Sequence, residues 1–308
     1  MKIGFLYAGQ GAQKEQMGKA LYETYETAQK LYDSIHLDID VKDLCFHGDL
    51  ATLSKTSNTQ PCMVATAAVI TELLKERGIT PDYAAGLSLG EYSALYAAGV
   101  FDFQTALELV RFRGLAMEDA VKGLDSMMSA ILGMEREPLS AICKEASSEG
   151  VVEIANYNCP GQLVIGGEKK AVEKAEAMAL EQGAKRAIRL NVSGPFHTSL
   201  LKPASDKLRE RFQSVPFGEM RFPVIFNSTA KPLAEGETIA ELLTRQVMSS
   251  VYLEDSIRYM MANGVDTFIE IGPGKALSGF VKKISRGVTI YQVEDPETLE
   301  KTVASIKQ

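Results

Sequence analysis

The sequence Gly86-Leu87-Ser88-Leu89-Gly90-Glu91-Tyr92 lies between a short apolar segment and a segment with helical spacing. A Gly-x-Ser-x-Gly string between a strand and a helix is typical of a nucleophile elbow. The glycines permit a tight turn that exposes the Ser88 hydroxyl, and the helix N-terminus directs N–H groups toward an oxygen that becomes anionic during acyl transfer. The same string is compatible with a serine that only caps the helix. Ser88 is therefore a predicted nucleophile that needs a base.

The base has few candidates, because the chain has only three histidines. A serine hydroxyl is a weak nucleophile until a neighbouring base takes its proton. His36 and His47 lie in polar segments that are typical of the surface. His197 lies in a Gly/Pro-rich loop after a predicted strand, and such loops often carry catalytic residues. His197 is thus the predicted base. No motif supplies a carboxylate partner for its ring, and we expect Glu91 to point elsewhere.

Composition excludes several classes of protein. The chain has 308 residues, 45% of them hydrophobic, which is enough for one large domain or two unequal ones. Its net charge of −7 makes it a poor general binder of nucleic acid. No apolar stretch approaches the roughly 20 residues that a membrane span needs, and the N-terminal segment is too short and polar for a signal peptide.

The cysteines indicate a reducing compartment. Cys45, Cys62, Cys143 and Cys159 are scattered and form no CxxC pair, which is typical of reduced thiols in a cytosolic protein. No cluster of His, Cys or carboxylate residues has metal-ligand spacing. We therefore expect a cytoplasmic protein, a monomer, without a metal, a membrane span or a nucleic-acid partner.

Strand-like and helix-like segments alternate along most of the chain, which indicates an α/β fold. The predicted strands of the larger part are 2–8, 83–87, 224–227, 267–271 and 288–292. The predicted helices are 13–35, 60–78 with Pro61 in the first turn, 89–99, 103–121 and 276–284.

Residues 127–190 follow a different order. The predicted elements are a strand at 127–134, a helix at 138–148, strands at 151–157 and 162–165, a helix at 168–182 and a strand at 185–190. The order β-α-β-β-α-β is the split arrangement of a ferredoxin-like unit. We predict an inserted domain at 125–191 and a catalytic domain made of 1–124 and 192–308.

Five motifs in a fixed order carry a family resemblance. They are Gly9-Gln10-Gly11-Ala12-Gln13, the 86–92 elbow, Arg113-Gly114, Gly194-Pro195-Phe196-His197 and Ile269-Glu270-Ile271-Gly272-Pro273-Gly274. Together they resemble the malonyl-CoA:acyl-carrier-protein transacylases of bacterial type II fatty-acid synthesis over essentially the whole chain. The resemblance extends to the acyltransferase domains of polyketide synthases. It implies a hydrolase-like large domain with a short parallel sheet and a ferredoxin-like insertion.

The resemblance also implies an activity: transfer of malonyl from malonyl-CoA to the phosphopantetheine thiol of an acyl carrier protein, for fatty-acid elongation. Coenzyme A thioester would be a substrate, with no bound cofactor. Ser88 would carry the malonyl ester, and His197, oriented by a backbone carbonyl, would be the base. The backbone N–H groups of Gln10 and Leu89 would form the oxyanion hole. The other implied site residues are Arg113 for the malonyl carboxylate, the malonyl-selecting Phe196, Gln246 near the histidine, and Asn156 and Gln162 on the coenzyme A side.

Two departures from the family pattern concern residues next to the site. Leu87 stands where the family usually has histidine beside the nucleophile, and Ala8 stands where it usually has proline. The first could alter packing or acyl tolerance, and the second loop rigidity. The residues alone do not choose between Arg111 and Arg113; only the Arg-Gly pair of the resemblance favours Arg113.

Three other functions fit the same residues. A thioesterase or esterase would use the same Ser88 and His197 and differ only in whether water or a thiol resolves the ester. A docking module for a carrier protein would have no catalysis at all. An acyltransferase serving a polyketide carrier would share the whole site.

Overall fold

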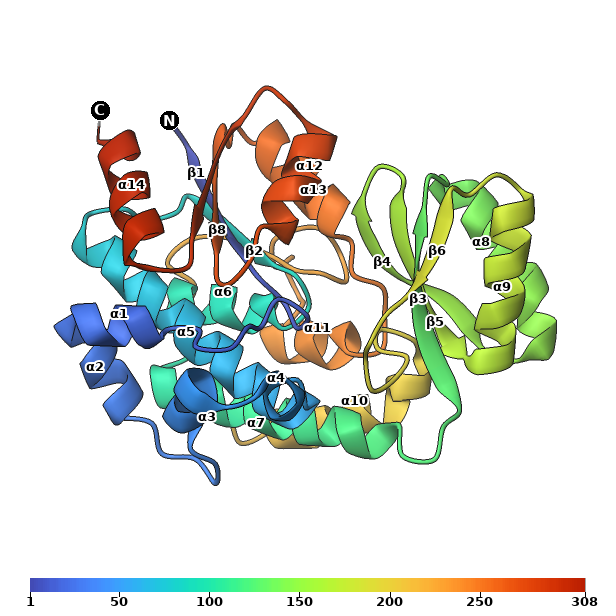
Figure 1. Ribbon diagram of the computed structural model, residues 1–308, viewed down its shortest axis with the longest axis horizontal. Coiled ribbons are helices and arrows are strands. Elements are labelled where there is room, and N and C mark those ends of the chain that lie inside the picture. The colour runs from blue at the N-terminus through green and yellow to red at the C-terminus, as the bar shows by residue number, and fades with distance from the viewer. Residues whose placement is uncertain (308) are drawn as a thin grey trace.

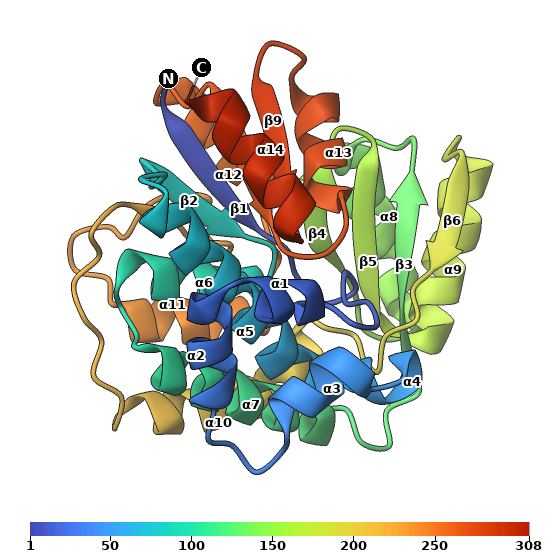
Figure 2. The same ribbon diagram turned by 60° about the vertical axis from the view of Figure 1, so that its left-hand side comes forward.

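The computed structural model describes residues 1–307, and its larger part is built on a five-stranded parallel sheet (Figures 1 and 2). The strands are β1 (Ile3–Tyr7), β2 (Tyr83–Gly86), β7 (Val224–Ile225), β8 (Thr267–Ile271) and β9 (Thr289–Val293), in the order β7-β2-β1-β8-β9. The predicted α/β fold with a parallel sheet is confirmed. Parallel strands end at the same edge, so the segments that follow β1, β2 and β7 meet there.

Helices cover both faces of this sheet, as its continuous apolar strands require. They are α1 (Lys19–Thr24), α2 (Glu26–Asp33), α3 (Val41–His47), α4 (Leu50–Leu53), α5 (Thr56–Glu76), α6 (Gly90–Ala98), α7 (Phe103–Ala120), α10 (Lys202–Phe212), α11 (Ile239–Gln246), α12 (Leu253–Ala262), α13 (Ala276–Ile284) and α14 (Pro296–Ile306). Successive side chains of β1 point to opposite faces. Phe5 and Tyr7 join the core of α5, α6 and α7, whereas Leu6 joins the core of α12 and α13.

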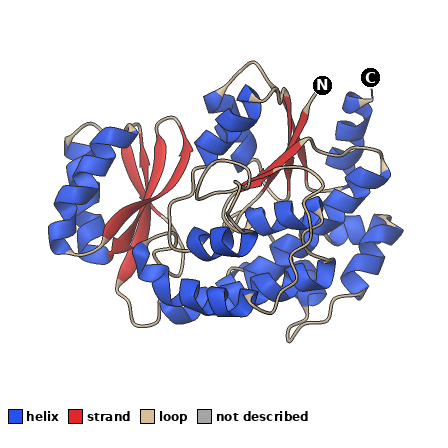
Figure 3. Cartoon of the chain, turned by 180° about the vertical axis from the view of Figure 1, so that it is seen from behind, coloured by secondary structure: helices blue, strands red, loops and turns tan. Residues whose placement is uncertain are grey.

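A second, antiparallel sheet lies beside the first (Figure 3). Its elements in chain order are β3 (Ser126–Leu132), α8 (Arg136–Ala146), β4 (Val152–Cys159), β5 (Gln162–Glu168), α9 (Lys169–Glu181) and β6 (Arg186–Arg189), and the strand order is β4-β5-β3-β6. This is the ferredoxin-like arrangement that the sequence predicts. Both helices pack on one face and enclose a separate apolar core. The exact limits of an inserted domain at 125 and 191 stay a prediction.

The two sheets are joined through β4. The backbone N–H of Tyr157 donates to Val251 O at 2.9 Å, and the N–H of Val251 donates to Ala155 O at 2.8 Å. The Tyr157 ring stacks on Tyr252 with 4.8 Å between centroids. This seam fixes the segment that connects α11 to α12, which also contacts the His197 loop.

Two predicted helices begin elsewhere. The segment 13–35 forms turns and then two short helices, because Tyr25 between them is extended. The helix predicted at 60–78 is α5, which starts at Thr56, so Pro61 lies inside it and not in its first turn. Proline has no N–H to donate to the carbonyl four residues before it. In this protein that carbonyl, Ser57 O, accepts a hydrogen bond from Arg111 Nη1 at 2.9 Å, so the polar group is satisfied.

Two further features of the described chain concern membranes and metals. No helix within residues 1–307 has both the length and the apolar character for a membrane crossing. The same residues contain no group of three or more His, Cys, Asp or Glu side chains arranged to hold a metal ion.

Candidate active site

The turn between β2 and α6 is a tight elbow that only glycine permits at two positions. A Cβ on Gly86 would lie 1.9 Å from the Gly90 carbonyl carbon, and one on Gly90 would lie 2.2 Å from Tyr7 O. Ser88, between them, has a φ of 54°, in the left-handed region that non-glycine residues rarely adopt. The backbone is therefore bent so that Ser88 stands at the carboxyl edge of the sheet, immediately before a helix.

His197 lies directly against this serine. Ser88 Oγ and His197 Nε2 are 2.6 Å apart. The other ring nitrogen, Nδ1, is 2.9 Å from the backbone oxygen of Gln246, so Nδ1 carries the proton and donates it to that carbonyl. Nε2 is thereby left as an acceptor for the serine hydroxyl. The remaining histidines are exposed, and His47 Nδ1 lies 3.0 Å from Asp43 Oδ1.

The surroundings of His197 keep its ring neutral. Burial, and then the positive charge of Arg113, lower the pKa of His197 from 6.5 to about 4. An imidazole with this pKa is almost wholly unprotonated at neutral pH. The ring is therefore in the form that can take a proton from Ser88.

Arg113 and Arg111 project from the same helix but have different partners. Arg113 is buried, and its Nη2 donates to Ser88 Oγ at 3.2 Å and to Gln246 Oε1 at 3.0 Å. Arg113 Nε has no hydrogen-bond partner within residues 1–307. Arg111 is bonded to both carboxylate oxygens of Asp38, at 2.8 and 2.7 Å. The structure therefore places only Arg113 beside the serine, with donor capacity left for an anion.

Gln246 contacts every one of these groups. Its Nε2 donates to Ser88 O at 2.8 Å, its Oε1 accepts from Arg113, and its backbone oxygen accepts from His197. One residue thus connects the serine, the imidazole and the cation.

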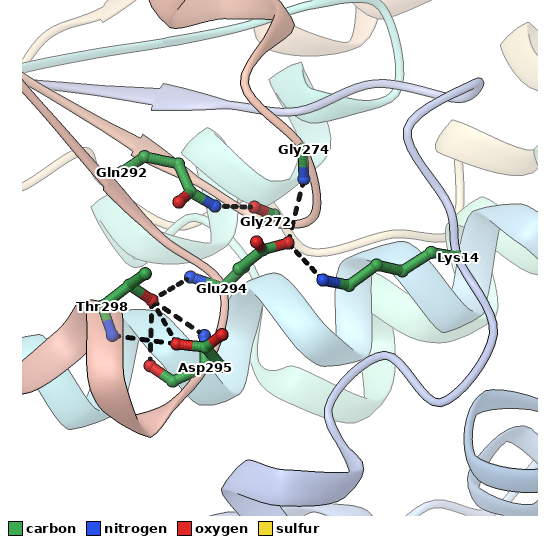
Figure 4. Close-up of polar contacts among 7 residues, drawn as sticks. All are labelled: Lys14, Gly272, Gly274, Gln292, Glu294, Asp295 and Thr298. Carbon is green, nitrogen blue, oxygen red and sulfur yellow. Dashed lines mark hydrogen bonds and ion pairs between the residues drawn. The ribbon is translucent and has the colours of Figure 1, made fainter.

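The loop after β1 carries Gln10. The Gln10 side chain donates to Thr56 Oγ1 at 3.0 Å, and further along the loop Lys14 pairs with Glu294, whose Oε2 also accepts from Gly274 N at 3.1 Å (Figure 4). Within residues 1–307 neither the backbone N–H of Gln10 nor that of Leu89 donates a hydrogen bond to the protein. Both N–H groups therefore have no acceptor among the described residues.

The other predicted site residues lie outside this hydrogen-bonded cluster. Phe196 immediately precedes His197 and is buried in the large core. Asn156 lies on β4 at the seam with Val251, and Gln162 begins β5, where its Oε1 accepts from Lys283 Nζ at 3.0 Å. In the described part of the chain, neither Asn156 nor Gln162 is hydrogen-bonded to Ser88, His197 or Arg113.

Next to the elbow lies a pair of bonded residues, Asn227 and Glu91, whose contact the sequence did not predict. Asn227, after β7, is fully buried and hydrogen-bonded to the elbow backbone. Glu91 does point away from His197, but its Oε2 accepts from Asn227 N at 2.5 Å. Burial, the largest cause, raises the pKa of Glu91 to about 8. An asparagine at the carboxyl end of a predicted parallel strand, the edge where Ser88 lies, was the signal that could have indicated Asn227.

A serine hydroxyl in contact with a neutral imidazole, on a strand-turn-helix elbow of a parallel sheet, defines a serine-dependent enzyme of the acyl-transfer class. Residues 4–294 match the family described as acyl transferase domain, and the chain belongs to that family. The malonyl CoA-acyl carrier protein transacylase of Bacillus subtilis is 47% identical over 310 residues, covering 100% of this chain and 98% of that relative.

Solved structures agree with the sequence relatives. The crystal structure of malonyl CoA-acyl carrier protein transacylase from Clostridium perfringens has a TM-score of 0.96 at 44% identity, covering 100% of this chain and 98% of that one. A structure of a type II polyketide acyl-carrier protein in complex with its malonyl-transacylase contains a chain that matches this protein with a TM-score of 0.96 at 36% identity. The match covers 99% of this chain and 100% of that one.

Proposed function

We propose that this protein transfers a malonyl group from malonyl-CoA to the phosphopantetheine thiol of an acyl carrier protein. The supporting observation is the 2.6 Å contact between Ser88 Oγ and His197 Nε2, with Arg113 Nη2 3.2 Å from the same oxygen. The first two groups supply a nucleophile and its base. The third is a cation that suits an acyl chain ending in a carboxylate, because a guanidinium matches a carboxylate with two parallel hydrogen bonds.

The first half-reaction acylates the serine. Ser88 Oγ attacks the thioester carbonyl carbon while His197 Nε2 takes the hydroxyl proton. The carbonyl oxygen becomes anionic and accepts hydrogen bonds from the N–H groups of Gln10 and Leu89, each of which contributes about 2.7–4 kcal/mol to the transition state. The C–S bond then breaks, and the His197 proton goes to the departing coenzyme A sulfur.

The second half-reaction reverses these steps with a different thiol. The pantetheine thiol of the carrier gives its proton to His197, and its sulfur attacks the malonyl ester. The C–O bond to Ser88 breaks, and the proton returns to the serine oxygen. Ser88, His197, Arg113 and the backbone N–H groups of Gln10 and Leu89 supply every chemical role in this cycle, so we propose that no cofactor takes part.

The site also indicates acyl selectivity. An acetyl group would leave the buried Arg113 guanidinium without an anion, which is costly in a desolvated site. Phe196, next to the base, would crowd a substituent on the malonyl α carbon. One methyl group in a pocket is typically discriminated by only about 1–3 kcal/mol. We therefore propose selection of malonyl over acetyl by Arg113 and a weaker preference against methylmalonyl by Phe196.

Coenzyme A carries phosphates, and one surface hollow offers cations for them. This hollow, of about 840 Å³, is lined by Pro160 and by Lys282, Lys283 and Arg286 at the end of α13. Lys283 also contacts Gln162, one of the residues expected on the coenzyme A side. We propose that the phosphorylated end of coenzyme A, or the acidic surface of a carrier protein, binds there. We further propose that the protein acts as a cytoplasmic monomer, since the cycle uses residues of one chain and diffusible substrates.

Intact-mass spectrometry after incubation with malonyl-CoA tests the proposal. The wild type should gain one malonyl group, and S88A should gain none. Absence of the adduct on the wild type would leave carrier docking as the better function.

A second measurement separates transfer from hydrolysis. Free malonate is followed with and without holo acyl carrier protein. Transfer requires that the carrier removes the malonyl group from Ser88 faster than water does. Equal malonate release under both conditions would instead assign a thioesterase.

A further inference from the structure

The side-chain amide of Asn227 connects both arms of the elbow. Its Nδ2 donates to Gly86 O at 2.7 Å, and its Oδ1 accepts from the backbone N–H of Ser88 at 2.8 Å. These two peptide groups lie on either side of Leu87, where the chain turns into the left-handed conformation of Ser88. Only a group with a donor and an acceptor a few ångströms apart can satisfy both, and a primary amide has both.

Asn227 is itself held from a second direction. Its backbone N–H donates to Glu91 Oε2 at 2.5 Å, and Glu91 is the second residue of the helix that Ser88 precedes. Gln246 Nε2, which donates to Ser88 O, also lies 3.3 Å from Asn227 Oδ1. The elbow is therefore bonded on one side by Asn227 and Glu91, and on the other by Gln246, whose carbonyl orients the base.

We infer that Asn227 is a positioning residue for acyl transfer: its amide fixes the Ser88 backbone so that Oγ meets His197 Nε2. The inference rests on the proposed function. A left-handed backbone conformation costs conformational energy in any residue other than glycine, and it persists only where the surrounding structure holds it. The Asn227 amide is hydrogen-bonded to Gly86 O and Ser88 N. Loss of the amide should therefore move the Ser88 hydroxyl and slow acylation, while the hydroxyl and the base both remain.

The isosteric variant N227D gives a test with a pH signature. When protonated, the introduced carboxyl can donate to Gly86 O and accept from Ser88 N, as the amide does. When ionised, it accepts only, and it faces the Gly86 carbonyl oxygen. Burial favours the protonated form. Acylation by N227D should therefore approach the wild-type rate at pH 6 and fall at pH 9, whereas N227A should be slow at both.

Other ionisable groups around the elbow are common to all variants. They are Glu91 on α6, Arg113 on α7, Arg245 on α11 and His197 in its loop. Ratios of each variant's rate to the wild-type rate at the same pH therefore report the new carboxyl together with any change that it causes in the titration of the neighbouring Glu91. A misplacement of a reacting group by about 1 Å can slow a reaction roughly 100-fold, and we expect a slowing of about 10- to 100-fold for N227A.

Quenched-flow acylation by excess malonyl-CoA, read as the malonyl mass on Ser88, separates positioning from loss of fold. Positioning predicts a wild-type amplitude with a lowered rate constant. Partial unfolding predicts a lowered amplitude with the wild-type rate constant, and this outcome would overturn the inference. Equal, pH-independent slowing of N227A and N227D would also overturn it.

Y32F is the matched control for lost stability. It removes a buried hydrogen bond, the 2.9 Å contact between the Tyr32 hydroxyl and Thr66 Oγ1, away from the elbow. Its rate constant should equal that of the wild type. A wild type that forms no adduct contradicts the proposed function, whereas an active wild type matched in rate by both Asn227 variants contradicts only the role of Asn227.

Discussion

Replacing Arg113 by alanine should change which acyl group the protein accepts. The guanidinium is buried beside Ser88, and its Nε has no hydrogen-bond partner within residues 1–307. Each charge-assisted hydrogen bond contributes about 1.5–3 kcal/mol, so a bidentate pair contributes about 3–6 kcal/mol. At about 1.4 kcal/mol per factor of ten, kcat/KM for malonyl-CoA should fall roughly 10²- to 10⁴-fold.

Competition measures this change directly. Malonyl-CoA and acetyl-CoA are mixed with the enzyme, and the masses of the two serine esters are compared during their initial formation. The ratio reports relative kcat/KM, in which any general damage to the site cancels. R113A should lose most of the malonyl preference, and R113K, which keeps the charge without the planar fork, should lie between R113A and the wild type.

R111A is the control, because it removes the same side chain two positions earlier on α7. Arg111 binds Asp38 and Ser57 O and does not contact Ser88. Its malonyl preference should equal that of the wild type. If R113A kept the wild-type ratio, or if R111A lost it, the assignment of the carboxylate site would be refuted.

Three further predictions concern the base, the fold and the coenzyme. Because the pKa of His197 in the free enzyme is lowered to about 4, kcat/KM for acylation should stay nearly constant as pH falls from 8 to about 5 and decline only below that; a decline centred near 6.5 would contradict the burial of the ring. R111A should lower the free energy of unfolding by about 1–3 kcal/mol by leaving Ser57 O unpaired, and adding P61A should restore part of it in urea unfolding, since alanine supplies the missing helical N–H. K283E should raise KM for malonyl-CoA and leave kcat nearly unchanged, with the exposed K301E, which changes the net charge by the same amount, as a charge control in steady-state assays; an unchanged KM would remove the hollow near Gln162 from the coenzyme site.

Local patterns were sufficient for part of this structure. The elbow places Ser88 by its glycines, the small number of histidines identifies His197, and the ferredoxin-like unit follows from periodicity in 127–190. Asn227 depends instead on which strand lies next to β2. The pairing of Ala85 with Ile225 brings Asn227 to the elbow. No local sequence pattern predicts the order of strands in a sheet.

The arginines and Pro61 show a second limit. Residues two apart on a helix point about 200° apart, so the spacing shows that Arg111 and Arg113 face different ways but not which one faces the serine. Packing against α5 decides that. Pro61 led us to predict the start of α5 too late. The hydrogen bond that proline cannot donate is replaced by one from Arg111, 50 residues away in sequence.

The charges around Ser88 link selection to catalysis. At neutral pH His197 is uncharged, and Glu91, whose pKa is about 8, is mostly protonated. The buried groups therefore carry one net positive charge, on Arg113, and that charge helps to hold the pKa of His197 low. A malonyl carboxylate bound to Arg113 would neutralise it and make His197 a stronger base at the moment a proton must move. Acetyl would leave the repulsion in place, so the carboxylate that is selected should also assist its own transfer.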